Sequence, residues 1–203
     1  MTERPILFSG AMVRAILGGE KTQTRRPVKP QPESALKWLD ESRCMEPENG
    51  VDPLIAWVPI GKSGAQSYWR CPYGVPGNRL WVREKGWQRP ERSLREMREG
   101  ADTWKPYYFD ADGLTKSDHD QFKAWGFKRR PSIHMPHCAS RIILEVTAVR
   151  VERLQEINED DARAEGCALS QNYMILWDLL NAKRAPWSSN PWVWVIGFRR
   201  VRG

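Results

Sequence analysis

Lys21 and Thr24 are the residues of this sequence whose types and spacing could carry out covalent chemistry. A threonine hydroxyl is a poor nucleophile until a neighbouring base takes its proton, and a lysine becomes such a base when burial or nearby cations lower its pKa. Arg25 and Arg26 follow directly and would supply those cations. Residue types alone favour a simpler interpretation, in which Lys21 to Arg26 form the solvated basic edge of a strand.

A zinc site is the second chemical hypothesis. Three of its ligands would come from an H-x-x-H-C cluster formed by His134, His137 and Cys138. The fourth would be the thiol of Cys71 or Cys44. Structural zinc sites usually show two short paired spacings, and only one occurs here, so ordinary loop histidines are the favoured interpretation. The sequence also lacks GxSxG, GxxxxGK[ST], GxGxxG and HExxH motifs. We therefore expect no metal and no cofactor.

The composition is basic and rich in tryptophan. The 203 residues suit one domain spanning 1–203, and they carry a net charge of +7 and eleven tryptophans. This favours an anionic partner such as nucleic acid or nucleotide, although simple solubility explains the charge equally well. No apolar run reaches the roughly 18 residues of a membrane helix, and the four cysteines form no CxxC pair. We expect a cytoplasmic protein without disulfides or membrane contact; the sequence leaves its oligomeric state open.

Helices and strands must hold Lys21 and Thr24 in place. Ser9 is a suitable N-cap for a helix that Gly18 and Gly19 end, and the segment 20–26 then turns into a strand. Residues 141–154 form the longest β-rich run and should be a central strand. Further predicted elements are a short helix from Asn158 to Ala164 ended by Gly166, a helix capped by Ser170, and a strand over 192–201.

The strand predicted over 77–84 carries two further candidates. Alternation places Glu84 on the same face as Leu80 and Val82, where a carboxylate is costly to bury unless it is paired. Its expected partners are Lys21, Arg25 or a substrate amine, so Glu84 is either a structural ion pair or a pocket residue. Trp81 and Trp87 could stack on a base or fill the core.

Two long insertions separate these elements. Residues 27–76 hold eight of the fifteen prolines and suggest an irregular excursion, while 88–130 are charge-dense with a hairpin turn at 110–113. Few strands with short helices between them predict an α+β fold, a small barrel or strongly curved sheet with helices packed outside.

Three segments together resemble a known family. The pattern R-P-I-L-F-S-x-x-M-V-R-A-I-L-x-G-x-K-T-Q-T-R-R (4–26), G-N-R-L-W-V-R-E (77–84) and the acidic segment 159–166 are similar to ASCH-domain proteins of phages and prophages. That superfamily shares a PUA-like β-barrel and includes RNA-binding modules and a small bacterial amidohydrolase that deacetylates N4-acetylcytidine. The resemblance implies such a barrel here, flanked by short helices and enlarged by the two insertions.

The resemblance also implies a catalytic set. Matching the G-x-K-T-x-T motif makes Thr24 the nucleophile, Lys21 its base and Glu165 the acid or orienting partner for the leaving amine, with no metal. Backbone N–H groups around Gly19 to Thr22 could bind the oxyanion. The expected substrate-binding residues are Gly19, Thr22, Arg25, Trp81, Glu84 and Trp87.

The rival hypothesis is a non-catalytic RNA-binding module, or a ribonuclease, of the same superfamily. Its basic surface would consist of Arg25, Arg26, Lys128, Arg129, Arg130, Arg199 and Arg200. The favoured enzyme would instead remove an acyl group from the exocyclic N4 of cytidine or a related nucleoside.

Overall fold

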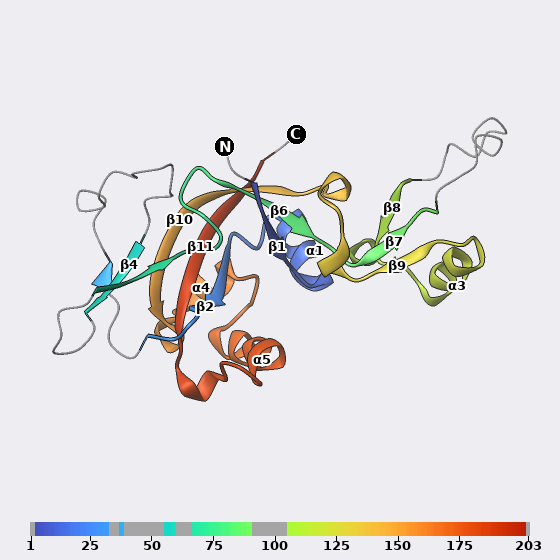
Figure 1. Cartoon of the computed structure of the whole chain (residues 1–203). Helices are drawn as coiled ribbons and strands as arrows, with labels where there is room; N and C mark the ends of the chain where they lie inside the picture. Colours follow the sequence, from blue (N-terminus) through green and yellow to red (C-terminus); the bar gives the residue numbers. More distant parts are fainter. Residues whose placement is uncertain (1–2, 33–36, 39–54, 60–65, 91–104, 202–203) are drawn as a thin grey trace.

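A mixed five-stranded sheet forms the centre of the molecule (Figure 1). The computed structural model describes residues 3–32, 37–38, 55–59, 66–90 and 105–201. The strand order is β1 (Glu3–Leu7), β6 (Arg79–Arg83), β10 (Ile143–Arg153), β11 (Trp192–Val201) and β2 (Gln23–Pro27). β1 is parallel to β6 and the other neighbours are antiparallel. The predicted α+β class and the central position of β10 are confirmed.

Three helices pack against this sheet: α1 (Gly10–Gly18), α4 (Glu159–Ala164) and α5 (Ser170–Asn181). Ser9 caps α1 by accepting a hydrogen bond from the Met12 N–H, and Asn158 caps α4 in the same way, both as predicted. Ser170 is the first residue of α5 rather than its cap, since its hydroxyl donates to Glu159 instead. In the described part of the chain no helix is both long and apolar enough to cross a membrane.

The two faces of β11 line different hydrophobic cores. Trp194, Ile196 and Phe198 pack into the larger core with β1, β6, β10 and α1, whereas Val193 and Val195 pack into a smaller one with α4 and α5. Strand alternation accounts for this division. Five of the seven tryptophans whose side chains are described are buried, so most of them fill cores as expected: Trp81, Trp87, Trp177, Trp192 and Trp194.

The sheet curves until its two edge strands, β1 and β2, approach each other. A single side chain spans the seam, because Arg26 of β2 donates a hydrogen bond of 2.6 Å from its guanidinium to the carbonyl oxygen of Leu7 in β1. Within the described residues the two edges are not paired by backbone hydrogen bonds, and no closed barrel is formed. Pro5 and Pro27 lie in these edges, and proline cannot donate to a sheet ladder.

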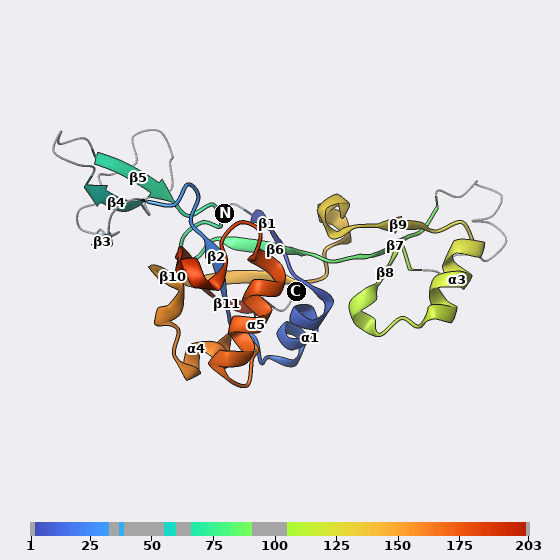
Figure 2. The ribbon, with the colours of Figure 1, turned by 90° about the horizontal axis from the view of Figure 1, so that it is seen from below.

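Both insertions contain small sheets, which lie on opposite sides of the central sheet (Figures 1 and 2). The first holds β3 (Lys37–Trp38), β4 (Ile55–Pro59) and β5 (Gln66–Arg70), so the expectation of an irregular segment over 27–76 was wrong. The second holds β7 (Gly86–Gln88), β8 (Tyr107–Phe109), β9 (Lys128–Arg130) and α3 (Lys116–Ala124). The hairpin turn expected at 110–113 is a 3-10 helix, Asp110–Asp112, that follows β8.

Candidate active site

Lys21 and Glu165, 144 residues apart in sequence, form a buried ion pair. The Lys21 ammonium donates to Glu165 twice, at 2.7 Å to the carboxylate oxygen Oε2 and at 2.8 Å to the backbone carbonyl. Their side chains are 0% and 2% exposed. The resemblance predicted that these two residues belong to one site, and the fold places them in direct contact.

Local backbone geometry brings the two residues together. Gly19 ends α1 with a φ of 80°, which lets the chain reverse, and Lys21 then forms an isolated β-bridge with Glu165 at the end of α4. Thr22 N–H donates to the Ala164 carbonyl at 2.9 Å. Gly166 also has a left-handed φ of 81°, and a Cβ there would lie 3.2 Å from the Ala15 Cβ. Glycine at 166 therefore allows α1 and α4 to approach closely.

Arg25 lies beside the pair and is enclosed by carboxylates. Its guanidinium bonds Asp161 at 2.8 Å, contacts Glu165 at 3.4 Å and also pairs with Glu152, while its side chain is 0% exposed. The ring of Tyr173 lies 5.9 Å from the guanidinium carbon. Three carboxylates on one buried cation satisfy charge that would otherwise be costly to bury. The structure thus favours a structural role for Arg25 over the predicted contact with substrate.

A half-exposed rim of polar side chains continues this network. Asp161 accepts hydrogen bonds from Gln23 at 3.0 Å and from Arg150 at 2.7 Å, and Arg150 also donates to Glu152 at 3.0 Å. Sequence reasoning missed Glu152, Asp161 and Arg150. Asp161 lies in the first turn of α4, where the helix dipole by itself favours an acidic residue. The alternation of Arg150 and Glu152 along β10 was the signal that could have indicated a shared polar face.

Burial and neighbouring charge shift the pKa values of these groups. Desolvation lowers the pKa of Lys21, outweighing the opposing attraction of Glu165, and the positive charge of Arg26 lowers it further. Burial alone would lower the pKa of Arg25, but Glu165, Glu152 and Asp161 together raise it. Desolvation opposes ionisation of Asp161, yet bonds from Gln23, Arg25 and Arg150 hold its pKa below the ordinary value. The arrangement therefore favours the ionised form of Asp161 and lowers the pKa of Lys21.

Thr24 is buried, at 1% exposure, on the other face of β2 from Arg25. In the β2–β11 register Thr24 is opposite Ile196 and Arg25 is opposite Val195, which belong to the larger and smaller core respectively. No hydrogen bond joins Thr24 to Lys21 or Glu165 among the described residues. The Lys21 ammonium, however, lies 5.9 Å from the ring centroid of Phe8, a member of the larger core. Lys21 therefore lies between Glu165 and the side of β2 that carries Thr24.

Glu84 belongs to a different cluster, and the expectation that it pairs with Lys21 or Arg25 was wrong. It is 1% exposed and accepts two hydrogen bonds from Arg141, at 3.0 and 2.8 Å. Arg141 also binds Asp112 at 2.7 Å and stacks over Phe109 at 4.0 Å. Of the two roles considered for Glu84, the structural ion pair is the one observed.

Trp81 and Trp87 also lie away from the Lys21–Glu165 pair, in packed positions. Trp81 meets His137 edge-on with ring centroids 5.0 Å apart, and Arg83 covers its ring at 4.6 Å. Trp87, in the sheet of β7, donates from its indole to His119 at 2.7 Å. Both side chains are less than 10% exposed. The structure therefore shows them as packed core residues and not as free surfaces on which a base could stack.

The remaining sequence candidates have other partners. His137 pairs with Glu3 at 2.7 Å, and the described residues contain no group of three or more side chains suited to a metal ion; Cys44 lies outside them. Within the basic surface of the rival hypothesis, Arg129 pairs with Asp110 at 2.5 Å and Arg199 with Glu145 at 3.0 Å.

Comparison of the chain with protein-family models, with curated proteins and with solved structures finds no match.

Proposed function

We propose that the protein is a metal-independent amidohydrolase that removes an acyl group from the exocyclic N4 of cytidine or a related nucleoside. The observation that carries the proposal is the buried Lys21–Glu165 pair, whose lysine lies three residues before Thr24 in the sequence. A lysine whose pKa is lowered by burial is suited to accept a hydroxyl proton, and a threonine lies three residues away on the same chain segment. These residue types match those that the ASCH resemblance implies.

The reaction follows from these roles. The Lys21 amine takes the proton of the Thr24 hydroxyl, whose oxygen attacks the acyl carbon and forms a tetrahedral intermediate. Its collapse breaks the carbon–nitrogen bond, and the lysine ammonium returns the proton to the leaving N4 nitrogen. Water, deprotonated by Lys21, then attacks the acyl-threonine carbonyl, and the lysine ammonium returns the proton to the Thr24 oxygen as the carboxylic acid is released. N–H groups in the Gly19 to Thr22 segment supply the oxyanion donors in this scheme.

Glu165 is assigned the orienting role in this mechanism rather than that of the acid. Its carboxylate is held by Lys21 on one oxygen and by Arg25 on the other, so both oxygens already accept hydrogen bonds. A carboxylate so placed fixes the direction of the lysine amine. Arg25 and its carboxylates fill the opposite face of β2, so substrate reaches Thr24 from the Arg26 side of the strand.

The proposal includes a finer description of the fold. We interpret the five-stranded sheet as a PUA-like (ASCH) barrel that remains open between β1 and β2. The support is the curvature that brings both edges to the Arg26–Leu7 hydrogen bond and the helices that pack outside the sheet.

Hydrolysis of N4-acetylcytidine, followed by the ultraviolet shift on deacylation, tests the function. Thr24→Ala should lower kcat by at least about 10³-fold and Lys21→Ala by about 10²–10⁴-fold. Thr147→Ala, at an exposed position of β10, is the matched control and should keep full activity. Near-ultraviolet circular dichroism checks that each variant is folded. Full turnover by folded Thr24→Ala would disprove the nucleophile, and no turnover by the wild type would disprove this substrate.

A further inference from the structure

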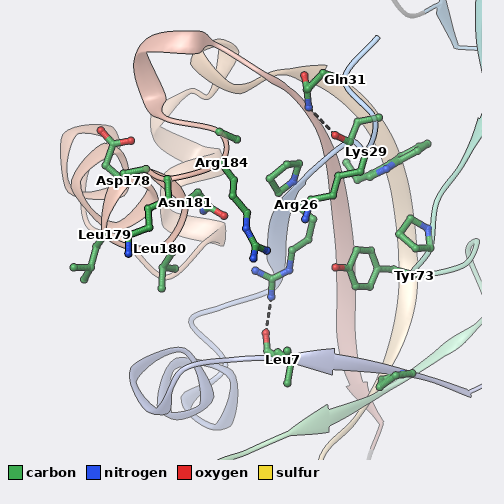
Figure 3. Close-up of a pocket in the computed structure, with 18 of the residues that line it drawn as sticks. Leu7, Arg26, Lys29, Gln31, Tyr73, Asp178, Leu179, Leu180, Asn181 and Arg184 are labelled. Carbon is green, nitrogen blue, oxygen red and sulfur yellow. Dashed lines mark hydrogen bonds between the residues drawn. The ribbon is translucent and has the colours of Figure 1, made fainter. Parts of the chain in front are cut away.

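A large groove lies along the open seam of the sheet, between the edges of β1 and β2 and the C-terminal end of α5 (Figure 3). Its volume is about 1230 Å³. Pockets for drug-sized molecules usually enclose roughly 300–1,000 Å³. The groove is thus larger than a nucleobase alone requires.

The lining of this groove is strongly cationic. Within the part of the chain that the structure describes, the lining has one carboxylate, Asp178, and six basic side chains: Arg26, Lys29, Arg70, Arg83, Lys183 and Arg184. Asp178 is already engaged, since it accepts a hydrogen bond of 2.7 Å from the Trp187 N–H. Among the described residues none of the six cations is in an ion pair, whereas Arg25, Arg129 and Arg141 each pair with carboxylates. The groove therefore carries an excess of positive charge among its described lining residues, and this charge complements an anion.

Two of these cations converge. In Figure 3 the guanidinium groups of Arg26, from β2, and Arg184, which follows α5, point toward one another across the groove. Like charges at close range repel, and a bound anion between them would relieve that repulsion. Guanidinium groups match phosphate oxygens with paired hydrogen bonds.

The groove shares strand β2 with the proposed nucleophile, because Arg26 of that strand lines it. Arg26 and Thr24 are alternate residues on one face of β2, about 7 Å apart along the strand. The Phe8 ring lies between a cation of the groove and the proposed catalytic base. The Arg26 guanidinium carbon is 5.3 Å from its centroid and the Lys21 ammonium 5.9 Å. A ligand held by Arg26 and Arg184 would therefore extend toward Thr24.

We infer that the groove binds the phosphate of a nucleotide, so that the substrate is a phosphate ester of the modified nucleoside rather than the free nucleoside. This inference rests on the proposed function for the identity of the base. The group that the groove would recognise is a nucleotide phosphate. Both a free 5′-monophosphate and a single strand of RNA carry such a phosphate.

Three probes separate these sources: N4-acetylcytidine, its 5′-monophosphate and a short single-stranded RNA containing one N4-acetylcytidine. We expect a KM at least about tenfold lower for one or both phosphate-bearing substrates than for the nucleoside. The variant Lys183→Glu/Arg184→Glu should remove that preference without changing kcat for the nucleoside. Lys116→Glu/Lys123→Glu, which reverses two exposed charges on α3, is the control and should retain it.

Equilibrium binding of cytidine 5′-monophosphate and of unmodified RNA, measured calorimetrically, gives a readout that is independent of turnover. One outcome is phosphate-dependent binding that the groove variant loses, in a protein that shows no hydrolase activity. This result would support phosphate binding in the groove and disprove the proposed function. Hydrolysis with equal KM values for nucleoside, monophosphate and RNA, unchanged in the groove variant, overturns the groove inference and leaves the enzyme in place.

Discussion

Replacing Arg25 with methionine tests whether the buried carboxylate cluster depends on this one cation. The Arg25 side chain is fully buried, and removing it leaves Glu152, Asp161 and Glu165 without their shared guanidinium. Asp161 keeps Gln23 and Arg150, and Glu165 keeps Lys21, so the loss is partial for each carboxylate. Methionine approximates the length of the arginine stem without its charge.

The expected cost follows from the burial. Breaking a buried ion pair by removing one partner typically costs about 3–5 kcal/mol, because the remaining charge is poorly solvated. For a chain of this size each kcal/mol lowers Tm by roughly 2–4 °C, so Arg25→Met should melt about 6–20 °C below the wild type. At acid pH the difference in the free energy of unfolding between the wild type and Arg25→Met should become smaller. The lowered pKa of Asp161 contributes stability at pH values above its unfolded pKa, and that contribution is lost as pH falls through the folded pKa.

Urea unfolding at pH 7 and at about pH 3, below the ordinary pKa of an aspartate, with calorimetric Tm values, measures both effects. Arg150→Met is the matched control, since Arg150 binds Asp161 and Glu152 as well but is 42% exposed. Exposed ion pairs are worth about 0–1 kcal/mol, so this variant should lose less than about 1 kcal/mol. Equal losses in the two variants would refute the argument from burial, and so would a loss below about 1 kcal/mol for Arg25→Met.

Three further predictions concern other buried groups. The pKa of Lys21 is lowered in the folded state, so the unfolded chain binds more protons at pH values between that pKa and about 10.4. In urea titrations the free energy of unfolding of the wild type, relative to that of Lys21→Met, should therefore rise with pH across this window. A difference that does not change with pH would contradict the lowered pKa. Glu84→Gln weakens the hydrogen bonds from Arg141 and should lower the free energy of unfolding by about 1–3 kcal/mol. Its kcat/KM for N4-acetylcytidine should stay unchanged. Loss of activity in a folded variant would indicate that Glu84 belongs to the substrate pocket after all. Burial raises the pKa of Cys71 to about 11, so iodoacetamide at pH 8 should label exposed Cys138 well before Cys71 in peptide mass spectra, and equal labelling rates would contradict that burial.

Local signals predicted the elements that form the candidate site. The Ser9 and Asn158 caps, the glycines at 19 and 166 and the alternation along 141–154 each depend on residues close in sequence, and they correctly indicated α1, α4 and β10. The pairing of Lys21 with Glu165 spans 144 residues, and only the resemblance to a known family pointed to it.

The failures came where long-range pairing decides the outcome. Glu84 was recognised as a buried carboxylate that needs a cation, but several arginines fitted equally well, and the fold selects Arg141. The strands of the first insertion are only two to five residues long, and β4 contains Pro59, so their alternation was too weak to recognise. The role of Arg25 was missed because its three partners come from β10 and α4, which approach β2 only in the folded sheet.

Strand β2 acts as a partition between two polar environments. On one face Arg25 is paired with three carboxylates, and on the other Arg26 faces a groove whose described lining holds six basic side chains and one carboxylate. Lys21 stands at the end of the strand, held by Glu165 while the charge of Arg26 lowers its pKa. An anion bound at Arg26 would weaken that effect and raise the pKa of Lys21, so a phosphate-bearing substrate would favour the protonated lysine that returns a proton to the leaving nitrogen. Binding and proton transfer would then be coupled through Arg26, which lines the groove and also lowers the pKa of Lys21.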